Sequence, residues 1–487
     1  MKKNFALLCS LLLLLLTLSA GCEFSGSEQE YPAQSTKSLQ ELLAMNYADM
    51  SEADTDRLDL LTGSMSGEVY TEKYGSIEQN SDSRTILDDL TSVIWGSYEL
   101  VTIPGAVCAD GSPYKIFVMK STGFWNWLMG YTKNLVVYLE PGGACWDYPS
   151  CTGQAGIRGA SNLNGIPDNY MNLGAFIDEN QEGGSPMAAI SPIILRNNPT
   201  GDNVETSSWN KVFVPYCTGD VHSGNQVTTY TDPTGQNPPV TINHKGAVNI
   251  EKVIAYLKAT FPGMNKVMIT GCSAGGVGSL TNYHFFRKAL APKKLSILLD
   301  DSGPIFSSSG YQSYLQEEIQ DLWNTDYLLT KLMADIPEFD FSGDFSEIHE
   351  ALAFKYPNDK LGLTLFKRDR NFSGYSYARF YDLDEADPVD AEQIMTYWAS
   401  DIDDLTEIYD SYGNLSYYIP YMRIINESHC TCIVEWTGTE YLDTGIDVGT
   451  YINDLLDGGS VTSYEEPDNP SDAEVTDFWM DLVNLLL

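Results

Sequence analysis

Short apolar runs alternate with segments of helical periodicity through the middle of the chain. Each run is rich in Val, Ile and Leu and ends at a turn signal, as expected for a strand buried in a sheet. Over residues 247–261, apolar residues recur every three or four positions before the helix stop Pro262-Gly263, which predicts a helix with one buried face. The sequence therefore predicts an α/β fold with a mostly parallel central sheet flanked by helices. The predicted strands are residues 135–140, 212–216, 266–270 and 295–299.

The N-terminus has the pattern of an export signal. Two lysines precede an apolar run over residues 5–18, which is too short for an ordinary membrane-spanning helix. Small residues then lead to Cys22, an arrangement that resembles the lipobox of bacterial lipoproteins, except that Ser19 stands where leucine is usual. We therefore predict a lipoprotein-type signal peptide over residues 1–21 and a lipid anchor at Cys22, which would hold an exported protein at the bacterial envelope or cell surface. Plain secretion and an uncut anchor are the alternatives.

The composition changes after this signal. Residues 22–85 are polar and acidic, so we predict an acidic tether there, followed by one folded domain over residues 86–487. The chain has 28 basic and 67 acidic residues and a formal net charge of -39. This charge argues against nucleic acid as a partner, because proteins bind nucleic acid by neutralising its phosphates. It also argues against a general attraction to anionic lipid, so the predicted membrane contact depends on the anchor.

The nine cysteines bear on the redox compartment. Cys9 lies in the signal and Cys22 at the predicted anchor, which leaves seven, so at least one of them is unpaired. Export permits disulfides among these seven. Cys145 and Cys151 lie close together in a loop with glycine and proline, and we predict that they pair. The connectivity of the others cannot be read from the sequence.

The stretch "MITGCSAGGVGSL", residues 268–280, joins a predicted strand to a predicted helix. Gly271-Cys-Ser273-Ala-Gly275 fits the nucleophile-elbow pattern G-x-S-x-G in the strand-turn-helix context that this pattern requires. In such an elbow the serine lies on a sharp turn, and the amide of the following residue, here Ala274, points toward the oxyanion. Ser273 is therefore the candidate nucleophile, and a plain glycine-rich turn is the alternative.

A nucleophilic serine needs a general base, and the chain has five histidines. An α/β-hydrolase has its triad in the order serine, acid, histidine, and three of the five histidines follow Ser273. His284 lies eleven residues into the helix that leaves the turn, roughly 16 Å along its axis, and cannot reach back. His349 lies in an acidic segment that we predict to be a solvated helix start. His429, in a compact late loop, remains as the candidate base. A core histidine, or a metal ligand with the two cysteines beside it, is the alternative, although no second metal-binding cluster matches it.

A second loop offers donors for an oxyanion. Gly142 and Gly143 follow a predicted strand, where unhindered amides are able to turn inward. The triad acid is not chosen by residue chemistry alone, because many carboxylates lie between the serine and the histidine. Asp301 follows another predicted strand. A later acidic cluster comprises Asp382, Asp384, Asp387 and Asp390.

Several motifs in sequence order resemble the pectin acetylesterase and Notum family of serine carboxylesterases. The resemblance extends from about residue 95 to about residue 440 and is far more specific than the elbow alone. The motifs are "GAVCADGSPY" (105–114), "VVYLEPGGACWDYPSC" (136–151), "VFVPYCTGDVHSG" (212–224), the elbow, and "DDSGPIF" (300–306).

The resemblance implies an α/β-hydrolase-like fold with a triad of serine, aspartate and histidine, carried over to Ser273 and His429. The family's aspartate lies in an Asp-x-x-Gln-apolar pattern, which only Asp390-Ala-Glu-Gln-Ile fits here and which selects Asp390 as the acid. Asp301 is the second choice, because its Asp-Ser-Gly matches a family segment without a triad role. Where the family often has a tryptophan after its glycines, this chain has Ala144, which reshapes the substrate mouth and leaves the substrate open.

The resemblance thus implies that residues 86–487 are a pectin acetylesterase-like hydrolase domain that works through an acyl-enzyme, with Gly142, Gly143 and Ala274 as oxyanion donors. The first predicted substrate is a short acyl ester, such as an acetyl ester, on an extracellular carbohydrate. A carboxylesterase for lipid-acyl or other small esters is the second candidate. A catalytically inactive surface-binding homologue is the third. Neither a metal nor an organic cofactor is implied.

Overall fold

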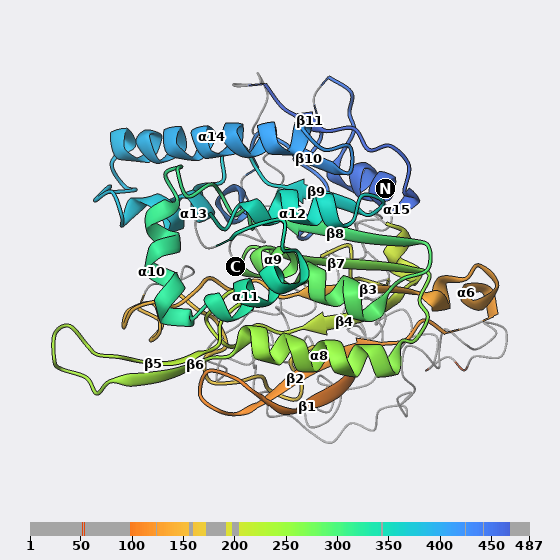
Figure 1. Cartoon of the computed structure of the whole chain (residues 1–487), viewed down its shortest axis with the longest axis horizontal. Coiled ribbons are helices and arrows are strands. Elements are labelled where there is room, and N and C mark those ends of the chain that lie inside the picture. The colour runs from red at the N-terminus through yellow and green to blue at the C-terminus, as the bar shows by residue number, and fades with distance from the viewer. Residues whose placement is uncertain are drawn as a thin grey trace, which may run out of the picture. The chain divides into compact units, whose positions relative to one another are not determined.

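A sheet with the strand order β1-β2-β4-β3-β7-β8-β9-β10-β11 forms the centre of the described part of the chain (Figure 1). β2 pairs antiparallel with both β1 and β4, and the remaining neighbours pair in parallel. The predicted α/β class with a mostly parallel sheet is confirmed. The strands of this sheet are β1 (Glu99–Val107), β2 (Pro113–Met119), β3 (Asn134–Leu139), β4 (Asn210–Val214), β7 (Lys266–Cys272), β8 (Leu295–Asp301), β9 (Lys360–Thr364), β10 (Leu415–Ile419) and β11 (Tyr464–Glu465).

The computed structural model describes a defined part of the chain. This part is residues 98–467 without residues 123, 155–158, 172–190, 197–203, 342–343, 424 and 442, together with residues 51 and 53. The chain divides into two compact units, and the larger one, Glu99–Asp168, Glu182–Ile194 and Val204–Leu487, contains the sheet. The predicted signal peptide, the lipidation site Cys22 and almost all of the tether lie outside the described residues. Within the described part, no helix combines the length and apolarity that crossing a membrane requires.

The predicted buried strands lie at the centre of the sheet. Every residue of β3 and β4 is buried, as are all but the first residue of β7 and of β8. Burial on both faces explains why these strands are continuous apolar runs rather than alternating patterns. A separate antiparallel pair, β5 (Gln226–Tyr230) and β6 (Val240–His244), lies outside the main sheet.

Helices cover the sheet, and the predicted helix over residues 247–261 is α8. α8 packs beside α9, which in turn contacts β7, β8 and α12 (Figure 1). α15 contacts β9. The described helices are α6 (Phe124–Leu128), α8 (Gly246–Thr260), α9 (Ala274–Leu290), α10 (Ser313–Trp323), α11 (Asp326–Asp335), α12 (Glu347–Lys355), α13 (Arg370–Ser373), α14 (Pro388–Asp410) and α15 (Val448–Asp457), with shorter turns at η2 (Tyr131–Lys133), η5 (Glu205–Ser208), η6 (Gly374–Ala378) and η7 (Ile425–Ser428).

Candidate active site

Ser273 occupies the turn between β7 and α9, at the carboxyl end of a central strand. Its backbone has φ 55° and ψ -122°, a conformation that costs energy for a residue with a side chain and that persists only where its surroundings enforce it. The Ser273 amide donates to the carbonyl oxygen of Asp301 at 2.8 Å, and the Val277 amide donates to the Ser273 carbonyl at 3.0 Å. This strained turn is the geometry expected of a nucleophile elbow.

Two glycines of the elbow allow the close approach of β3. A Cβ atom at Gly271 or at Gly275 would collide with the carbonyl oxygen of Leu139. Since the chain continues from Leu139 into the loop with Gly142 and Gly143, this contact brings the elbow and that loop together. The G-x-S-x-G pattern is therefore required by packing as well as by the turn.

His429 lies in a buried loop after η7 and forms an acid–imidazole pair with Asp369. The His429 Nδ1 atom lies 2.7 Å from Asp369 Oδ2, and both side chains are almost completely buried. A carboxylate accepts but does not donate, so Nδ1 carries the proton and Nε2 is left with its lone pair. Burial raises the pKa of Asp369, and the neighbouring His429 opposes this rise.

The predicted pairing of His429 with Asp390 is not the one that the structure has. Asp390 lies in the first turn of α14, where its carboxylate accepts the Asp384 amide at 2.9 Å. Asp369 instead directly precedes α13, and its Oδ1 accepts the Phe372 amide at 2.8 Å. The Asp-x-x-Gln pattern pointed to Asp390, whereas Phe372 stands at the glutamine position after Asp369. The signal available in the sequence was the apolar run of residues 361–366, which places Asp369 just beyond the carboxyl end of a strand.

Asp301, the second choice for the acid, holds the loop that carries His429. Its Oδ1 accepts the amide and hydroxyl of Thr431 at 2.8 and 3.0 Å, and its Oδ2 accepts the Cys432 amide at 3.0 Å. The neighbouring Ser302 hydroxyl accepts the Cys430 amide at 3.1 Å. Asp301 thus fixes the segment directly after His429 to the end of β8.

A disulfide that the sequence did not predict joins Cys272 to Cys430, with a Cα–Cα distance of 5.7 Å. One ligand atom of His429 lies within 4.8 Å of both sulfur atoms. Because the two sulfurs are bonded to each other, they offer no thiolate to a metal.

The structure also has the expected Cys145–Cys151 disulfide and a third between Cys108 and Cys217. Cys432 is a buried free thiol.

The predicted oxyanion donors lie at the same cavity as Ser273. Gly142 and Gly143 follow β3 with φ 148° and 61°, and Ala274 is the first residue of α9. Among the described residues, neither the Gly142 nor the Gly143 amide has a hydrogen-bond partner. Unpaired amides beside a helix N-terminus are suited to stabilise a developing negative charge.

Two hydrogen bonds of Glu140 fix the start of the loop that contains Gly142 and Gly143. Its buried carboxylate accepts the Tyr216 amide at 2.7 Å, and its carbonyl accepts His222 Nε2 at 2.9 Å. Burial lowers the pKa of His222 to about 4, so this imidazole is neutral at physiological pH and acts as a structural donor.

Two other histidines have structural contacts. His284 pairs with Asp335 at 2.9 Å, away from the elbow as its position in α9 requires. His349 is not solvated, contrary to the sequence prediction, because α12 buries it beside the Ile305 carbonyl, which lies 3.1 Å from Nε2. Its neighbours in α12, Glu347 and Glu350, are only partly buried and did not reveal this burial.

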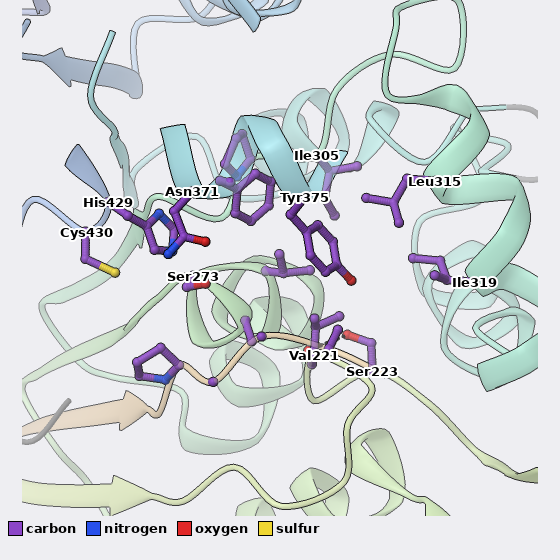
Figure 2. A pocket seen from close by; sticks show the side chains of 18 of the residues that line it. Val221, Ser223, Ser273, Ile305, Leu315, Ile319, Asn371, Tyr375, His429 and Cys430 are labelled. Carbon is purple, nitrogen blue, oxygen red and sulfur yellow. Dashed lines mark hydrogen bonds between the residues drawn. The ribbon is translucent and has the colours of Figure 1, made fainter. Parts of the chain in front are cut away.

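A cavity of about 260 Å³ lies over Ser273 (Figure 2). His429 and Asn371 lie at one side, and Leu315 and Ile319 of α10 lie at the opposite side. No hydrogen bond joins Ser273 to His429 in the described residues, as is common in ligand-free sites whose bonds tighten only with substrate. Apolar side chains form most of the remaining wall: Val221, Val277, Pro304, Ile305, Trp323, Phe345, Phe372, Tyr375, Ile433 and Val434.

Comparison with known families supports the resemblance found in the motifs. Residues 97–338 match the family model described as Pectinacetylesterase. Pectin acetylesterase 4 of Arabidopsis thaliana is 29% identical over 210 residues, which cover 42% of this chain and 42% of that protein. Palmitoleoyl-protein carboxylesterase NOTUM of Drosophila melanogaster is 28% identical over 205 residues, which cover 40% of this chain and 26% of that protein. The matched region spans less than half the length of these relatives.

Among solved structures, that of the Wnt deacylase Notum from Drosophila is similar to this chain. It is 17% identical, with a TM-score of 0.48, and the match covers 76% of this chain and 97% of that structure. The family model and the two relatives from Arabidopsis thaliana and Drosophila melanogaster confirm the predicted resemblance to pectin acetylesterases and Notum.

Proposed function

We propose that this protein, whose residues 97–338 match the pectinacetylesterase family model, is a serine carboxylesterase that uses Ser273, His429 and Asp369. One observation carries the proposal: a strained elbow serine and a buried acid–imidazole pair line the same cavity. These are the parts that acyl transfer through a serine requires. Asp369 takes the role that the sequence pattern had suggested for Asp390.

Acylation begins when Ser273 Oγ attacks the ester carbonyl carbon. His429 Nε2 accepts the hydroxyl proton, and Asp369 orients the imidazole and stabilises its charged form. The amides of Gly142, Gly143 and Ala274 bind the oxyanion of the tetrahedral intermediate. The imidazolium then protonates the leaving alcohol, and the acyl group stays on Ser273.

Deacylation repeats these steps with water. His429 Nε2 removes a proton from a water molecule, whose oxygen attacks the acyl carbon. The same amides stabilise the second oxyanion, and its collapse returns the proton to Ser273 and releases a carboxylic acid. The chain's own residues supply each proton transfer in this scheme.

The first candidate substrate is a short acyl ester on an extracellular carbohydrate. The relatives named pectin acetylesterases support this choice. A longer acyl ester is the second candidate, and the largely apolar wall of the cavity favours it. The cavity of about 260 Å³ is several times the ~30 Å³ that one water molecule occupies in the liquid, so it has room for more than an acetyl group.

We further propose that the protein is exported and held at a membrane surface by a lipid on Cys22, after removal of residues 1–21. The basic start, the short apolar run and the small residues before Cys22 support this. A mass measurement on the exported N-terminus tests it. A mature chain that begins at an unmodified Cys22, or at another residue, contradicts the anchor.

The catalytic proposal is tested by hydrolysis of p-nitrophenyl acetate. Ser273→Ala should lower the rate by about a thousandfold or more, because the nucleophile is lost. Ser223→Ala is the matched control, since Ser223 lines the same cavity but its hydroxyl is bonded to Thr281. Undiminished hydrolysis by Ser273→Ala contradicts the triad. If well-folded wild-type protein cleaves no ester at all, an inactive surface-binding homologue is the better description.

A series of p-nitrophenyl esters from acetyl to octanoyl and longer separates the two substrate candidates. A short-acyl enzyme should show kcat/KM falling as the chain lengthens. A clear preference for octanoyl or longer chains contradicts the acetylesterase proposal and supports an acyl chain that fills the apolar wall.

A further inference from the structure

Asn371 has an unpaired side-chain amide in the candidate active site. It is the second residue of α13 and follows the acid Asp369 by two positions. The residue is 9% exposed, and it lines the cavity that contains Ser273 and His429. Figure 2 shows the Asn371 amide beside the His429 ring, directed into the cavity. Among the described residues, no group forms a hydrogen bond with this amide.

The other amide side chains of the cavity wall are bonded to protein. Gln312 Nε2 donates to the Ser376 hydroxyl at 3.0 Å, and Gln316 Nε2 donates to the Phe306 carbonyl at 2.6 Å. These glutamines therefore have structural partners. Asn371 differs, because its amide faces the cavity with no protein partner among the described residues and is therefore free to bond a ligand.

The position of Asn371 assigns it to the alcohol side of the ester. The leaving alcohol must lie within hydrogen-bonding reach of His429, which protonates it. Asn371 lies on that side of the cavity, whereas Leu315 and Ile319 lie on the opposite, apolar side (Figure 2). The two sides thus divide the substrate into a polar alcohol part and an apolar acyl part.

We propose that Asn371 binds a hydroxyl group adjacent to the ester oxygen and thereby favours esters of polyhydroxylated alcohols, such as carbohydrates, over simple esters. This proposal rests on the carboxylesterase function above. An amide both donates and accepts, as does a hydroxyl, so one Asn371 side chain satisfies a hydroxyl in either orientation. A site built to bond a hydroxyl rejects the analogue that lacks it, because the site's own polar group is then left unpaired.

The test compares two substrates that differ by one hydroxyl. One is a methyl glycoside with an acetyl ester next to a free hydroxyl, and the other is its deoxy analogue at that hydroxyl. Wild-type protein should show a kcat/KM about tenfold or more higher for the hydroxylated ester. In Asn371→Ala this ratio should fall toward one. Gln316→Ala, which removes a cavity amide that is already bonded to protein, should keep the wild-type ratio.

Three outcomes decide the matter. A wild-type ratio near one overturns the proposal whether or not the variants fold. A wild-type preference that Asn371→Ala retains overturns it as well, provided that the variant melts like the wild type. If wild-type protein hydrolyses neither glycoside nor p-nitrophenyl acetate, the carboxylesterase function itself fails, and this proposal fails with it.

Discussion

The disulfide between Cys272 and Cys430 joins the residue before Ser273 to the residue after His429. The two cysteines are separated by 158 positions in sequence, and the crosslink fixes the distance between the elbow and the loop of the candidate base. Three of the four residues from 427 to 430 around His429, namely Glu427, Ser428 and Cys430, have positive φ, so this loop has an unfavourable backbone that needs external support. The disulfide provides such support at the point where geometry matters to a proton transfer.

The first prediction concerns removal of this disulfide. In a Cys272→Ser/Cys430→Ser double variant, kcat for p-nitrophenyl acetate should fall by about tenfold to a hundredfold, because small misplacement of the base is costly. The free energy of unfolding should fall by about 2–5 kcal/mol. Steady-state kinetics and urea denaturation measure the two effects.

Removal of another long-range disulfide is the control for this experiment. Cys108 and Cys217 are separated by 109 positions, and neither lines the cavity that contains Ser273 and His429. A Cys108→Ser/Cys217→Ser variant should lose comparable stability and yet keep kcat per folded molecule. Equal losses of kcat in both double variants would show that the Cys272–Cys430 bond acts only through stability.

The second prediction distinguishes the two candidate acids. Asp369→Asn removes the carboxylate that accepts from His429 Nδ1 and favours the wrong imidazole tautomer, so kcat should fall by about 10⁴-fold. Asp390→Asn is the matched control, since its carboxylate accepts only the Asp384 amide among the described residues, and kcat should change little. Hydrolysis of p-nitrophenyl acetate at saturating substrate measures both. A larger loss in Asp390→Asn would restore the acid chosen by the sequence pattern.

The contrast between Ser273 and Asp369 shows how far the sequence alone was informative. Ser273 was predictable because the elbow is a local feature: a buried apolar strand, small residues and a helix follow one another in sequence. The His429–Asp369 pair and the Cys272–Cys430 bond form between distant segments. Their pairing depends on how loops leave neighbouring strands, which no local hydrophobic pattern encodes. His349 illustrates the same limit, because acidic neighbours in sequence did not predict the face of α12 that is buried.

The third prediction concerns Asp301, which we expect to position His429 without touching substrate. Asp301→Asn cannot accept both the Thr431 and the Cys432 amides, so the loop after His429 loosens. We expect kcat to fall by about tenfold with a smaller change in KM, and the acidic limb of the kcat–pH profile to shift, because the environment of the imidazole changes.

The control for Asp301 is a buried carboxylate at the amino end of the neighbouring strand β9. Asp359 accepts from Arg287 at 2.6 Å and from the Tyr283 hydroxyl at 3.0 Å, just before β9 begins. Asp359→Asn should lower stability but leave the kcat–pH profile of the folded protein in place. If Asp301→Asn also changes only stability, its carboxylate has no positioning role.

The fourth prediction is a pH dependence of stability that originates at His349. Burial lowers its pKa to about 4, with the Ile305 carbonyl and Asp344 opposing that effect. A histidine whose folded pKa lies below its unfolded value of ~6.5 contributes stability that is present above pH ~6.5 and is lost as the pH falls through about 4.

Relative to His349→Gln, the free energy of unfolding of wild-type protein should therefore fall by up to about 3 kcal/mol between pH 7 and pH 4. Urea denaturation of both proteins at several pH values measures this difference. His284→Gln is the comparison: burial also lowers the pKa of His284, but Asp335 at 2.9 Å opposes this effect, so the pH dependence that originates at His284 should be weaker. If wild-type protein and His349→Gln differ in free energy of unfolding by the same amount at pH 7 and at pH 4, the pH dependence does not originate at His349.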